Sequence, residues 1–303
     1  MLEAAIDVGT NSVLVLLAEV EGRGERKHLK VLWEDEALTR LGEGIQQAGL
    51  LKPEAVSRTA EAVRRFVEEC RARGARRIVI VATSAARDAG NFSALREEIK
   101  SKTNLEVRVL SGREEAEAAF RGARAGHPSA DTPCLVIDVG GGSTELTYGK
   151  SKPEFWTSLD IGSVRLSERF LHADPFSAEE WQSVRSHIRE AFQRVRVQVP
   201  GIPKSVIGVG GTITTLAMLE LGVDRYVPER IHGLEISHRA IEGWTEKLSK
   251  MSRAERTRLP GVPALRGDVL PVGTAIFAEA LQAFGSPSLL VSTFGIRHGT
   301  LLE

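Results

Sequence analysis

The residues of this chain that are best suited to chemistry follow an apolar run near its middle, in the stretch LVIDVGGGSTE at positions 135–145. Glycines let main-chain N–H groups approach an anion closely, and the neighbouring hydroxyls of Ser143 and Thr144 add further donors. The acid at the end of the run, Asp138, can hold a hydrated divalent cation against a phosphate. These residue types in this order therefore indicate a phosphate-binding loop.

A matching loop occurs near the start of the chain, where IDVGTNS at positions 6–12 resembles IDVGGGS at positions 137–143. Neither loop is followed by the Gly-Lys-Ser/Thr of a P-loop, and the dinucleotide fingerprint is absent here. Two ordinary hairpin turns are the alternative, because glycines often follow apolar runs. The duplication favours phosphate binding, and it predicts two matched half-domains.

A candidate cation for the phosphate follows the continuous apolar run 77–82, which is typical of a buried parallel strand. The polar stretch TSAARDAGN comes directly after it and contains Arg87. Ligands of open α/β sheets bind beyond the carboxyl ends of the strands, so Arg87 is placed for function. An exposed structural arginine is the alternative.

A candidate acid lies at the start of a helix that is predicted from residue 111. Ser111 and Glu114 have the spacing of a capping box, which gives Glu114 a structural role. Glu115 has no such role, and it shares a helix face with small residues, so its carboxylate can project from a closely packed helix. The alternative is a solvated glutamate that is favoured by the helix dipole.

Hydrophobic periodicity predicts the elements that position these residues. In the first half we expect strands at 4–8, 13–20, 28–34, 77–82 and 105–110, and helices at 52–70, 92–101 and from 111. The turn-rich stretch 126–133 is the predicted boundary between a first domain, 1–126, and a second, 127–303. Packing of the last helix, 295–303, on the first domain is an alternative arrangement.

The second half repeats the order strand, glycine loop, strand. Further strands are expected at 145–149, 154–159, 205–209 and 288–292, and helices from 160, from a Ser177–Glu180 capping box, at 238–250, at 269–284 and from 294. The turn Gly210, Gly211, Thr212 begins one more helix. It is interpreted either as a second anion or nucleotide site or as tight packing of strand on helix.

Composition limits the function classes. The 303 residues carry 40 basic and 40 acidic side chains, so no strong global field attracts a nucleic acid or a membrane. Cys70 and Cys134 are expected to be two buried, reduced thiols. The N-terminus has no basic leader, and the apolar runs are too short to span a bilayer, so we expect a cytoplasmic protein.

Eight ordered blocks give the chain a specific resemblance: IDVGTNS, ATSAARDAGN, LSGREEAEAAFRGA, IDVGGGSTE, LDIGSVRLSERF, GVGGTITTLA, RGDVLPVGTAIF and FGIRHGTLL. The chain resembles the Ppx/GppA family of exopolyphosphatases and guanosine pentaphosphate phosphohydrolases. The resemblance implies an α/β fold of two ribonuclease-H-like domains, of the actin-like ATPase superfold, with an interdomain active-site cleft. It covers the chain from end to end.

The resemblance also implies roles for individual residues. Glu115 would activate the attacking water, and Arg87 would bind the terminal phosphoryl group. Magnesium, with manganese as a substitute, would be supported by Asp138, Asp7 and Glu145. The phosphate cradle would be formed by Asn11, Ser12, Gly141, Gly142, Ser143 and Thr144.

The expected function is release of the terminal phosphate of polyphosphate, with conversion of pppGpp to ppGpp as an alternative. A non-catalytic alarmone sensor and a kinase of the same superfold are further hypotheses; retention of Glu115 and Arg87 argues against the sensor. Longer relatives carry another helical domain after the last core helix, which puts processive digestion of long chains in doubt here. A homodimer is compatible with the resemblance.

Overall fold

The computed structural model describes residues 1–22, 27–125, 127 and 132–303. The chain forms two compact units: unit 1 consists of Met1–Ala125 and Gly295–Glu303, and unit 2 of Gly126–Phe294. The last residues of the chain therefore belong with the first half. Most of the predicted boundary stretch 126–133 lies outside the described residues.

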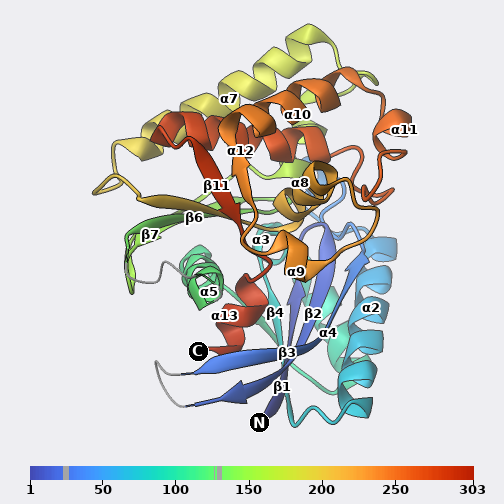
Figure 1. Ribbon diagram of the computed structural model, residues 1–303. Helices are drawn as coiled ribbons and strands as arrows, with labels where there is room; N and C mark the ends of the chain where they lie inside the picture. The colour runs from blue at the N-terminus through green and yellow to red at the C-terminus, as the bar shows by residue number, and fades with distance from the viewer. Residues whose placement is uncertain (23–26, 126, 128–131) are drawn as a thin grey trace. The chain divides into compact units, whose positions relative to one another are not determined.

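Unit 1 contains a five-stranded sheet in the order β3-β2-β1-β4-β5 (Figure 1). β3, β2 and β1 pair with one another in antiparallel fashion, and β4 and β5 continue the sheet in parallel with β1. The strands are β1 Leu2–Val8, β2 Ser12–Glu21, β3 His28–Leu38, β4 Arg77–Ala82 and β5 Val107–Val109. The third strand is longer than the predicted 28–34, and the fifth is shorter than the predicted 105–110.

Helices cover both faces of this sheet because β1 is apolar on both. Ala4, Ile6 and Val8 belong to the cluster under α2, whereas Ala5 packs with Leu301 on the other face. The first face carries α2 Pro53–Ala72, which packs on α4 Phe92–Thr103, and the second carries α13 Ile296–Leu301, which packs on α5 Gly112–Ala125. Two short helices, α1 Ile45–Ala48 and α3 Ser84–Asp88, complete the unit.

Unit 2 contains a six-stranded sheet in the order β10-β11-β9-β6-β7-β8. Its strands are β6 Cys134–Val139, β7 Thr144–Gly149, β8 Pro153–Leu159, β9 Ser205–Val209, β10 Glu235–Ser237 and β11 Ser288–Val291. The antiparallel run β8-β7-β6 followed by parallel β9 and β11 repeats the scheme of unit 1, as the duplicated loops predicted. Among the described strands, the antiparallel edge strand β10 alone has no counterpart, and it was not predicted.

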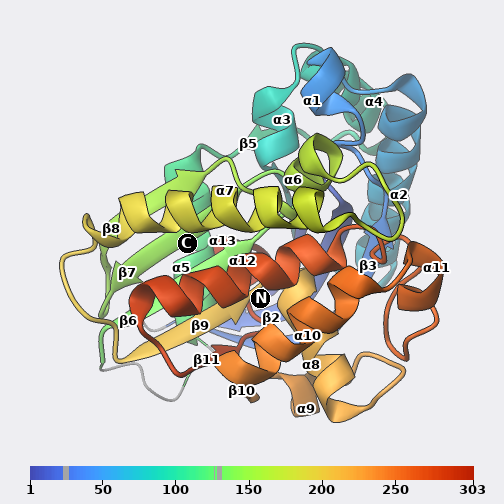
Figure 2. The same cartoon turned by 90° about the horizontal axis from the view of Figure 1, so that it is seen from above.

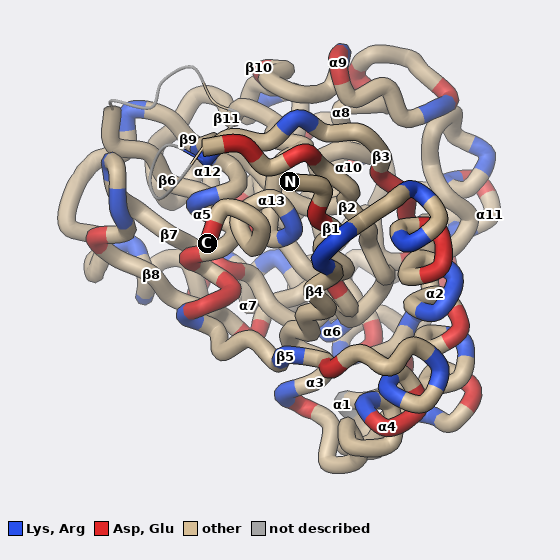
Figure 3. Tube along the Cα trace, turned by 90° about the horizontal axis from the view of Figure 1, so that it is seen from below, with Lys and Arg blue, Asp and Glu red and all other residues tan. Residues whose placement is uncertain are grey.

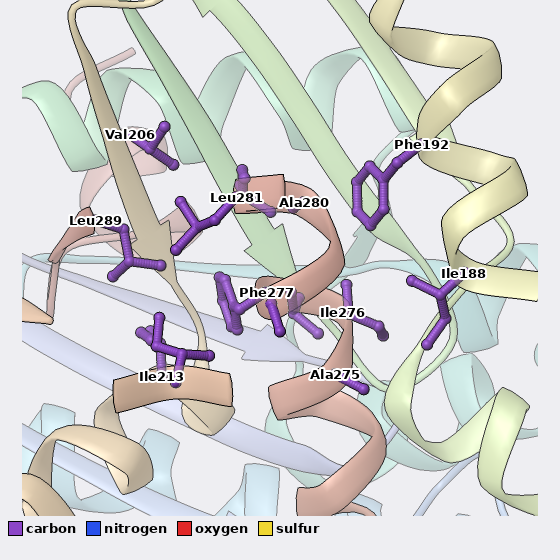
Figure 4. Packing of buried hydrophobic residues seen from close by; sticks show 14 of the residues in the cluster. Ile188, Phe192, Val206, Ile213, Ala275, Ile276, Phe277, Ala280, Leu281 and Leu289 are labelled. Atoms are coloured by element: carbon purple, nitrogen blue, oxygen red, sulfur yellow. The ribbon is translucent and has the colours of Figure 1, made fainter. Parts of the chain in front are cut away.

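The core of unit 2 is centred on α12 Leu270–Phe284, which is buried along most of its length. It packs against α7 Ala178–Arg196 and α10 His238–Lys250, and Figure 2 shows the three helices side by side. In Figure 4, Phe277 of α12 lies among aliphatic side chains from α8 and the sheet, while Phe192 of α7 packs nearby. The remaining helices are α6 Ser163–Phe170, α8 Gly211–Leu221, α9 Pro228–Ile231 and α11 Arg253–Arg256.

Basic and acidic residues are interspersed along the chain (Figure 3). Basic and acidic stretches alternate along α2 and α4 (Figure 3). In the part of the chain that the structure describes, no helix is long and apolar enough to cross a membrane.

Candidate functional site

The two glycine loops close in the same way. In the first, the Gly9 amide donates to the Ser12 carbonyl at 2.9 Å; in the second, the Gly140 amide donates to the Ser143 carbonyl at 3.0 Å. Each loop is a tight turn between antiparallel strands, β1 and β2 in unit 1 and β6 and β7 in unit 2. The sequence repeat is therefore a repeat of backbone structure.

The segment that follows β3 donates hydrogen bonds to the carbonyls of the first loop. The Thr10 carbonyl accepts from the Gly42 amide at 2.8 Å, and the Asn11 carbonyl accepts from the amides of Thr39 and Arg40 at 3.0 and 2.8 Å. Among the described residues, no hydrogen bond is donated by the amides of Thr10 and Asn11. These N–H groups have the arrangement that an anion-binding turn requires.

The second loop repeats this arrangement with the start of α6. The Gly141 carbonyl accepts from the amides of Val164 and Arg165 at 2.9 and 3.0 Å, and the Gly142 carbonyl accepts from Arg165 Nε at 2.5 Å. In the described part of unit 2, the amides of Gly141, Gly142 and Ser143 donate no hydrogen bond. The carbonyls of Gly141 and Gly142 therefore have hydrogen-bond partners within unit 2, and the amides of the turn can donate to an anion.

Close backbone contact holds the second loop in place. A Cβ atom on Gly162 would lie 2.2 Å from the Gly141 carbonyl oxygen, so only glycine fits there. The hydroxyl of Thr144 donates to the Ile161 carbonyl at 2.5 Å and is buried. The Thr144 hydroxyl therefore supports the loop, and its role in the phosphate cradle stays a prediction.

Two predicted metal-supporting acids of unit 2 are cross-strand partners. Asp138 of β6 lies opposite Glu145 of β7, so their side chains leave the sheet on the same face; both are buried. Ser158 donates to Glu145 Oε1 at 2.6 Å. Gly210 has a φ of 101°, and a Cβ atom there would lie 3.1 Å from Asp138 Oδ1. The Gly-Gly-Thr turn is thus adjacent to this acid pair.

An arginine that sequence reasoning gave no role supports the Gly-Gly-Thr turn. Arg266 is 8% exposed, and its Nη1 donates to the Gly211 carbonyl at 2.7 Å and to Thr215 Oγ1 at 3.1 Å. A Cβ atom on Gly211 would lie 2.3 Å from Arg266 Nη2. Tight packing therefore explains Gly211, and the second anion site stays a prediction. The block RGDVLPVGTAIF contained the arginine, but sequence spacing does not relate it to a turn 55 residues earlier.

Arg87 and Glu115 are brought together in unit 1. Arg87 Nη1 donates to Glu115 Oε2 at 2.5 Å and to the Leu110 carbonyl at 2.8 Å. Glu115 is 4% exposed, whereas the Arg87 side chain is 25% exposed. The pair was selected from two separate stretches of sequence, and its members are in direct contact.

Parallel strands explain why this pair lies near the first loop. Asp7 of β1 is in register with Val81 of β4, and the Thr83 amide donates to the Val8 carbonyl at 3.3 Å. The Leu110 amide in turn donates to the Ala82 carbonyl at 2.9 Å. The carboxyl ends of β1, β4 and β5 therefore meet at one edge of the sheet. Asp7, which is 7% exposed, lies at the end of the first of them.

The start of α5 is fixed by the predicted capping box. Ser111 Oγ accepts from the Glu114 amide at 3.2 Å, and Glu114 Oε2 accepts from the Ser111 amide at 2.8 Å. Hydrogen bonds from Arg108, and then from Ser111, lower the pKa of Glu114 to about 2. Glu114 thus has the structural role that its spacing predicted, and Glu115 is directed into the protein.

Backbone contact with α13 fixes the rest of α5. A Cβ atom on Gly299 would lie 1.8 Å from the Ala118 carbonyl oxygen, and one on Gly122 would lie 2.1 Å from the Gly295 carbonyl oxygen. Arg121 Nη1 also donates to the Gly299 carbonyl at 2.8 Å. The small residues beside Glu115 are explained by this contact, because the two helices meet without side chains between them.

The acid pair of unit 2 suits magnesium, which keeps water and phosphate ligands, better than it suits a metal whose ligands all come from the protein. No group of three or more His, Cys, Asp or Glu side chains that could hold a metal occurs in the described ranges. Magnesium is commonly bound by one or two carboxylates together with water and substrate phosphate. Asp138 and Glu145, a buried pair beside a turn with donor amides, fit that requirement.

Comparison with known proteins assigns the chain to a phosphatase family. The model of the Ppx/GppA phosphatase family matches residues 20–303. The chain belongs to this family. Exopolyphosphatase 2 of Mycobacterium tuberculosis is 34% identical to this Ppx/GppA member over 310 residues, which cover 99% of this chain and 97% of the relative. A bifunctional 3-dehydroquinate synthase/phosphatase of Fusobacterium nucleatum is 30% identical over 100% of this chain but only 46% of its own length.

Solved Ppx/GppA structures show the same fold. The Aquifex aeolicus family member matches with a TM-score of 0.82 at 30% identity and covers 100% of this chain and 96% of its own. An exopolyphosphatase from Cytophaga hutchinsonii matches with a TM-score of 0.89 at 27% identity, covering 99% and 96%. The predicted α/β fold of two ribonuclease-H-like, actin-like domains is confirmed.

Proposed function

We propose that this Ppx/GppA member is a magnesium-dependent exopolyphosphatase that hydrolyses the terminal phosphoanhydride of polyphosphate. The observation that carries the proposal is the contact between the half-buried Arg87 and the buried Glu115. It combines an acid that can accept a proton from water with a cation that can stabilise a phosphoryl group. The 34% identical relative, which is named an exopolyphosphatase, supports the choice of substrate.

Phosphoryl transfer to water needs alignment and charge neutralisation more than covalent help from the protein. In the proposed reaction, Glu115 orients a water molecule and accepts its proton as the oxygen attacks the terminal phosphorus. The bridging P–O bond breaks, and phosphate and a shortened chain leave. Arg87 has several N–H donors, so it can bind phosphoryl oxygens while it contacts Glu115.

The amides of the glycine loops would bind non-bridging phosphate oxygens, with Asn11, Ser12 and Ser143 as additional donors. Asp138 and Glu145 would hold magnesium, and Asp7 is a further acid proposed to support magnesium. When bound, the ion neutralises charge on the phosphate oxygens. Binding of a second anion or nucleotide at the Gly-Gly-Thr turn is a further part of the proposal.

Release of inorganic phosphate from polyphosphate tests the proposal, with pppGpp and ATP as competing substrates. Glu115→Gln is expected to reduce kcat by about 10²–10⁴-fold, the usual contribution of a general base. Glu114→Gln is the matched control, because it changes the adjacent glutamate, whose role is helix capping. Removal of magnesium with EDTA should stop phosphate release, and adding it back should restore it.

Equal activity of the Glu115→Gln and Glu114→Gln variants would refute the assigned mechanism. Faster hydrolysis of pppGpp than of polyphosphate would make the alarmone the substrate. Tight binding of pppGpp without turnover in the presence of magnesium would favour a sensor.

A further inference from the structure

Asn91 lies where a helix cap is expected, but its side chain makes a different contact. It directly precedes α4, and an asparagine at this position usually accepts from the first amides of the helix. In this described part of the chain, its side chain makes no such bond. Instead Oδ1 accepts from the Leu51 amide at 2.7 Å, and Nδ2 donates to the Leu51 carbonyl at 3.0 Å. The two residues are 40 positions apart, so the asparagine makes a tertiary contact.

This contact joins the end of α3 to the β3–α2 segment, which we define as residues 39–52. A further hydrogen bond lies beside it, from the Gly90 amide to the Gly49 carbonyl at 2.9 Å. Leu51 is 3% exposed, so this end of the segment is firmly packed. Asn91 therefore holds both backbone groups of a residue that is itself fixed in the core of unit 1.

The other end of the β3–α2 segment holds the first glycine loop. The amides of Thr39 and Arg40 donate to the Asn11 carbonyl, and the Gly42 amide donates to the Thr10 carbonyl. A Cβ atom on Gly42 would lie 2.3 Å from Thr10 Cγ2, so the segment and the loop are in close contact. The position of the loop therefore depends on the position of this segment.

The helix α3, which carries Arg87, is too short to be fixed without such contacts. It has five residues, Ser84–Asp88, and an isolated helix of this length is unstable. Before its start, the Thr83 amide donates to the Val8 carbonyl at the end of β1. After its end, Asn91 binds the β3–α2 segment. The glycine loop, this segment and α3 thus form a closed ring of hydrogen-bonded contacts.

We propose that Asn91 is a positioning residue for phosphate binding. Through Leu51 and the β3–α2 segment, it sets the distance between the amides of the first glycine loop and the guanidinium of Arg87. This inference rests on the proposed function and deepens it, because Asn91 acts without touching the substrate. A phosphoryl group that is bound by both sets of donors is held more tightly when their spacing is fixed beforehand, since less order is imposed on binding.

The test measures binding of inorganic tripolyphosphate, with magnesium, by calorimetry in the Glu115→Gln background, where turnover is slow. Asn91→Ala should weaken binding about tenfold, the effect of losing one charge-assisted hydrogen bond to the phosphate. Asn91→Ser keeps a hydroxyl but cannot hold both backbone groups of Leu51. This milder variant should weaken binding about threefold, and it replaces Asn91→Ala if circular dichroism shows that the alanine variant is unfolded.

A double-mutant cycle with Arg87→Ala separates positioning from a general effect on stability. The loop amides remain in that background and should retain weaker binding. If Asn91 acts by placing Arg87, its removal has little left to disturb once the guanidinium is absent. Asn91→Ala should therefore change the dissociation constant less than about twofold in the Arg87→Ala background. A merely structural role would weaken binding by the same factor in both backgrounds.

Arg71→Ala is the matched control, because it also removes a tertiary hydrogen bond that reaches α4. Arg71 Nη2 donates to the Thr103 carbonyl at 2.8 Å, at the opposite end of α4 from Asn91. This variant should leave the dissociation constant within about twofold of the background. Three results would each overturn the assignment: normal binding by Asn91→Ala, equal weakening with and without Arg87, or no binding of tripolyphosphate at all.

Phosphate release by the wild-type chain keeps the two proposals distinguishable. If it hydrolyses polyphosphate and Asn91→Ala binds tripolyphosphate normally, only the role of Asn91 fails. If it hydrolyses neither polyphosphate nor pppGpp but tripolyphosphate binding still depends on Asn91 through Arg87, the hydrolase proposal fails and the positioning role stands.

Discussion

Replacing Gly299 with alanine should damage both stability and activity. The new Cβ atom would lie 1.8 Å from the Ala118 carbonyl oxygen, whereas ordinary contact begins at 3.4 Å. The backbones of α5 and α13 would have to separate by roughly 1.6 Å, since neither contacting atom belongs to a flexible side chain. Overpacking typically costs about 1–3 kcal/mol, and a backbone clash should reach the upper value.

A loss of about 3 kcal/mol corresponds to a fall in melting temperature of roughly 5 °C, because the unfolding entropy grows with the number of residues. Activity should fall further than stability explains, because Ala118 lies one helical turn beyond Glu115. Thermal unfolding by circular dichroism and phosphate release at 25 °C measure the two effects.

Gly243→Ala is the matched control for this substitution. Gly243 lies in the exposed face of α10, and nothing is within 4 Å of a Cβ atom built there. This variant should be more stable than the parent by about 1 kcal/mol, the difference in helix propensity, and fully active. If Gly299→Ala melts within 2 °C of the parent and is equally active, the reasoning about helix contact is wrong.

Three further predictions concern groups outside the proposed chemistry. Hydrogen bonds from Arg108 and Ser111 lower the pKa of Glu114 from 4.5 to about 2, so its contribution to stability is present above pH 4.5 and is lost as the pH falls toward 2. Urea unfolding of Glu114→Gln should therefore show a smaller loss of stability across that interval than the parent. Ser177→Ala removes the acceptor of the Glu180 amide at the start of α7 and should lower the free energy of unfolding by about 1 kcal/mol in the same assay. Burial raises the pKa of Cys70 to about 11, and Cys134 is also buried, so a thiol reagent at pH 8 should modify neither residue until the protein is unfolded.

Local patterns predicted much of this fold because they depend on neighbouring residues. The apolar spacing Val56, Ala60, Val63, Val67 gave the buried face of α2, and the Ser177–Glu180 pair marked the start of α7; both are confirmed. The end of β3 was missed because the run of acids Glu34, Asp35 and Glu36 interrupts the apolar pattern. They form a strand only because they pair with β2, a tertiary interaction that periodicity does not contain.

In the candidate site, too, some features follow from local sequence and others depend on contacts between distant segments. The contact between Arg87 and Glu115 follows from two strands that end at one edge of a parallel sheet, which the strand predictions imply. The supporting roles of Arg165 and Arg266 do not follow, since each contacts a loop distant in the sequence. The left-handed backbone of Arg40 was also invisible, because the residue type does not indicate it.

The division of unit 1 into two sequence segments has a consequence for biosynthesis. On the ribosome, Gly126–Phe294 emerges as one continuous piece and can fold as soon as it is complete, whereas the first 125 residues must wait for Gly295–Glu303. Until then α5, which carries Glu115, lacks the helix that meets its small-residue face. The nascent chain therefore completes the unit that contains the Gly141–Ser143 turn before the unit that contains Arg87 and Glu115.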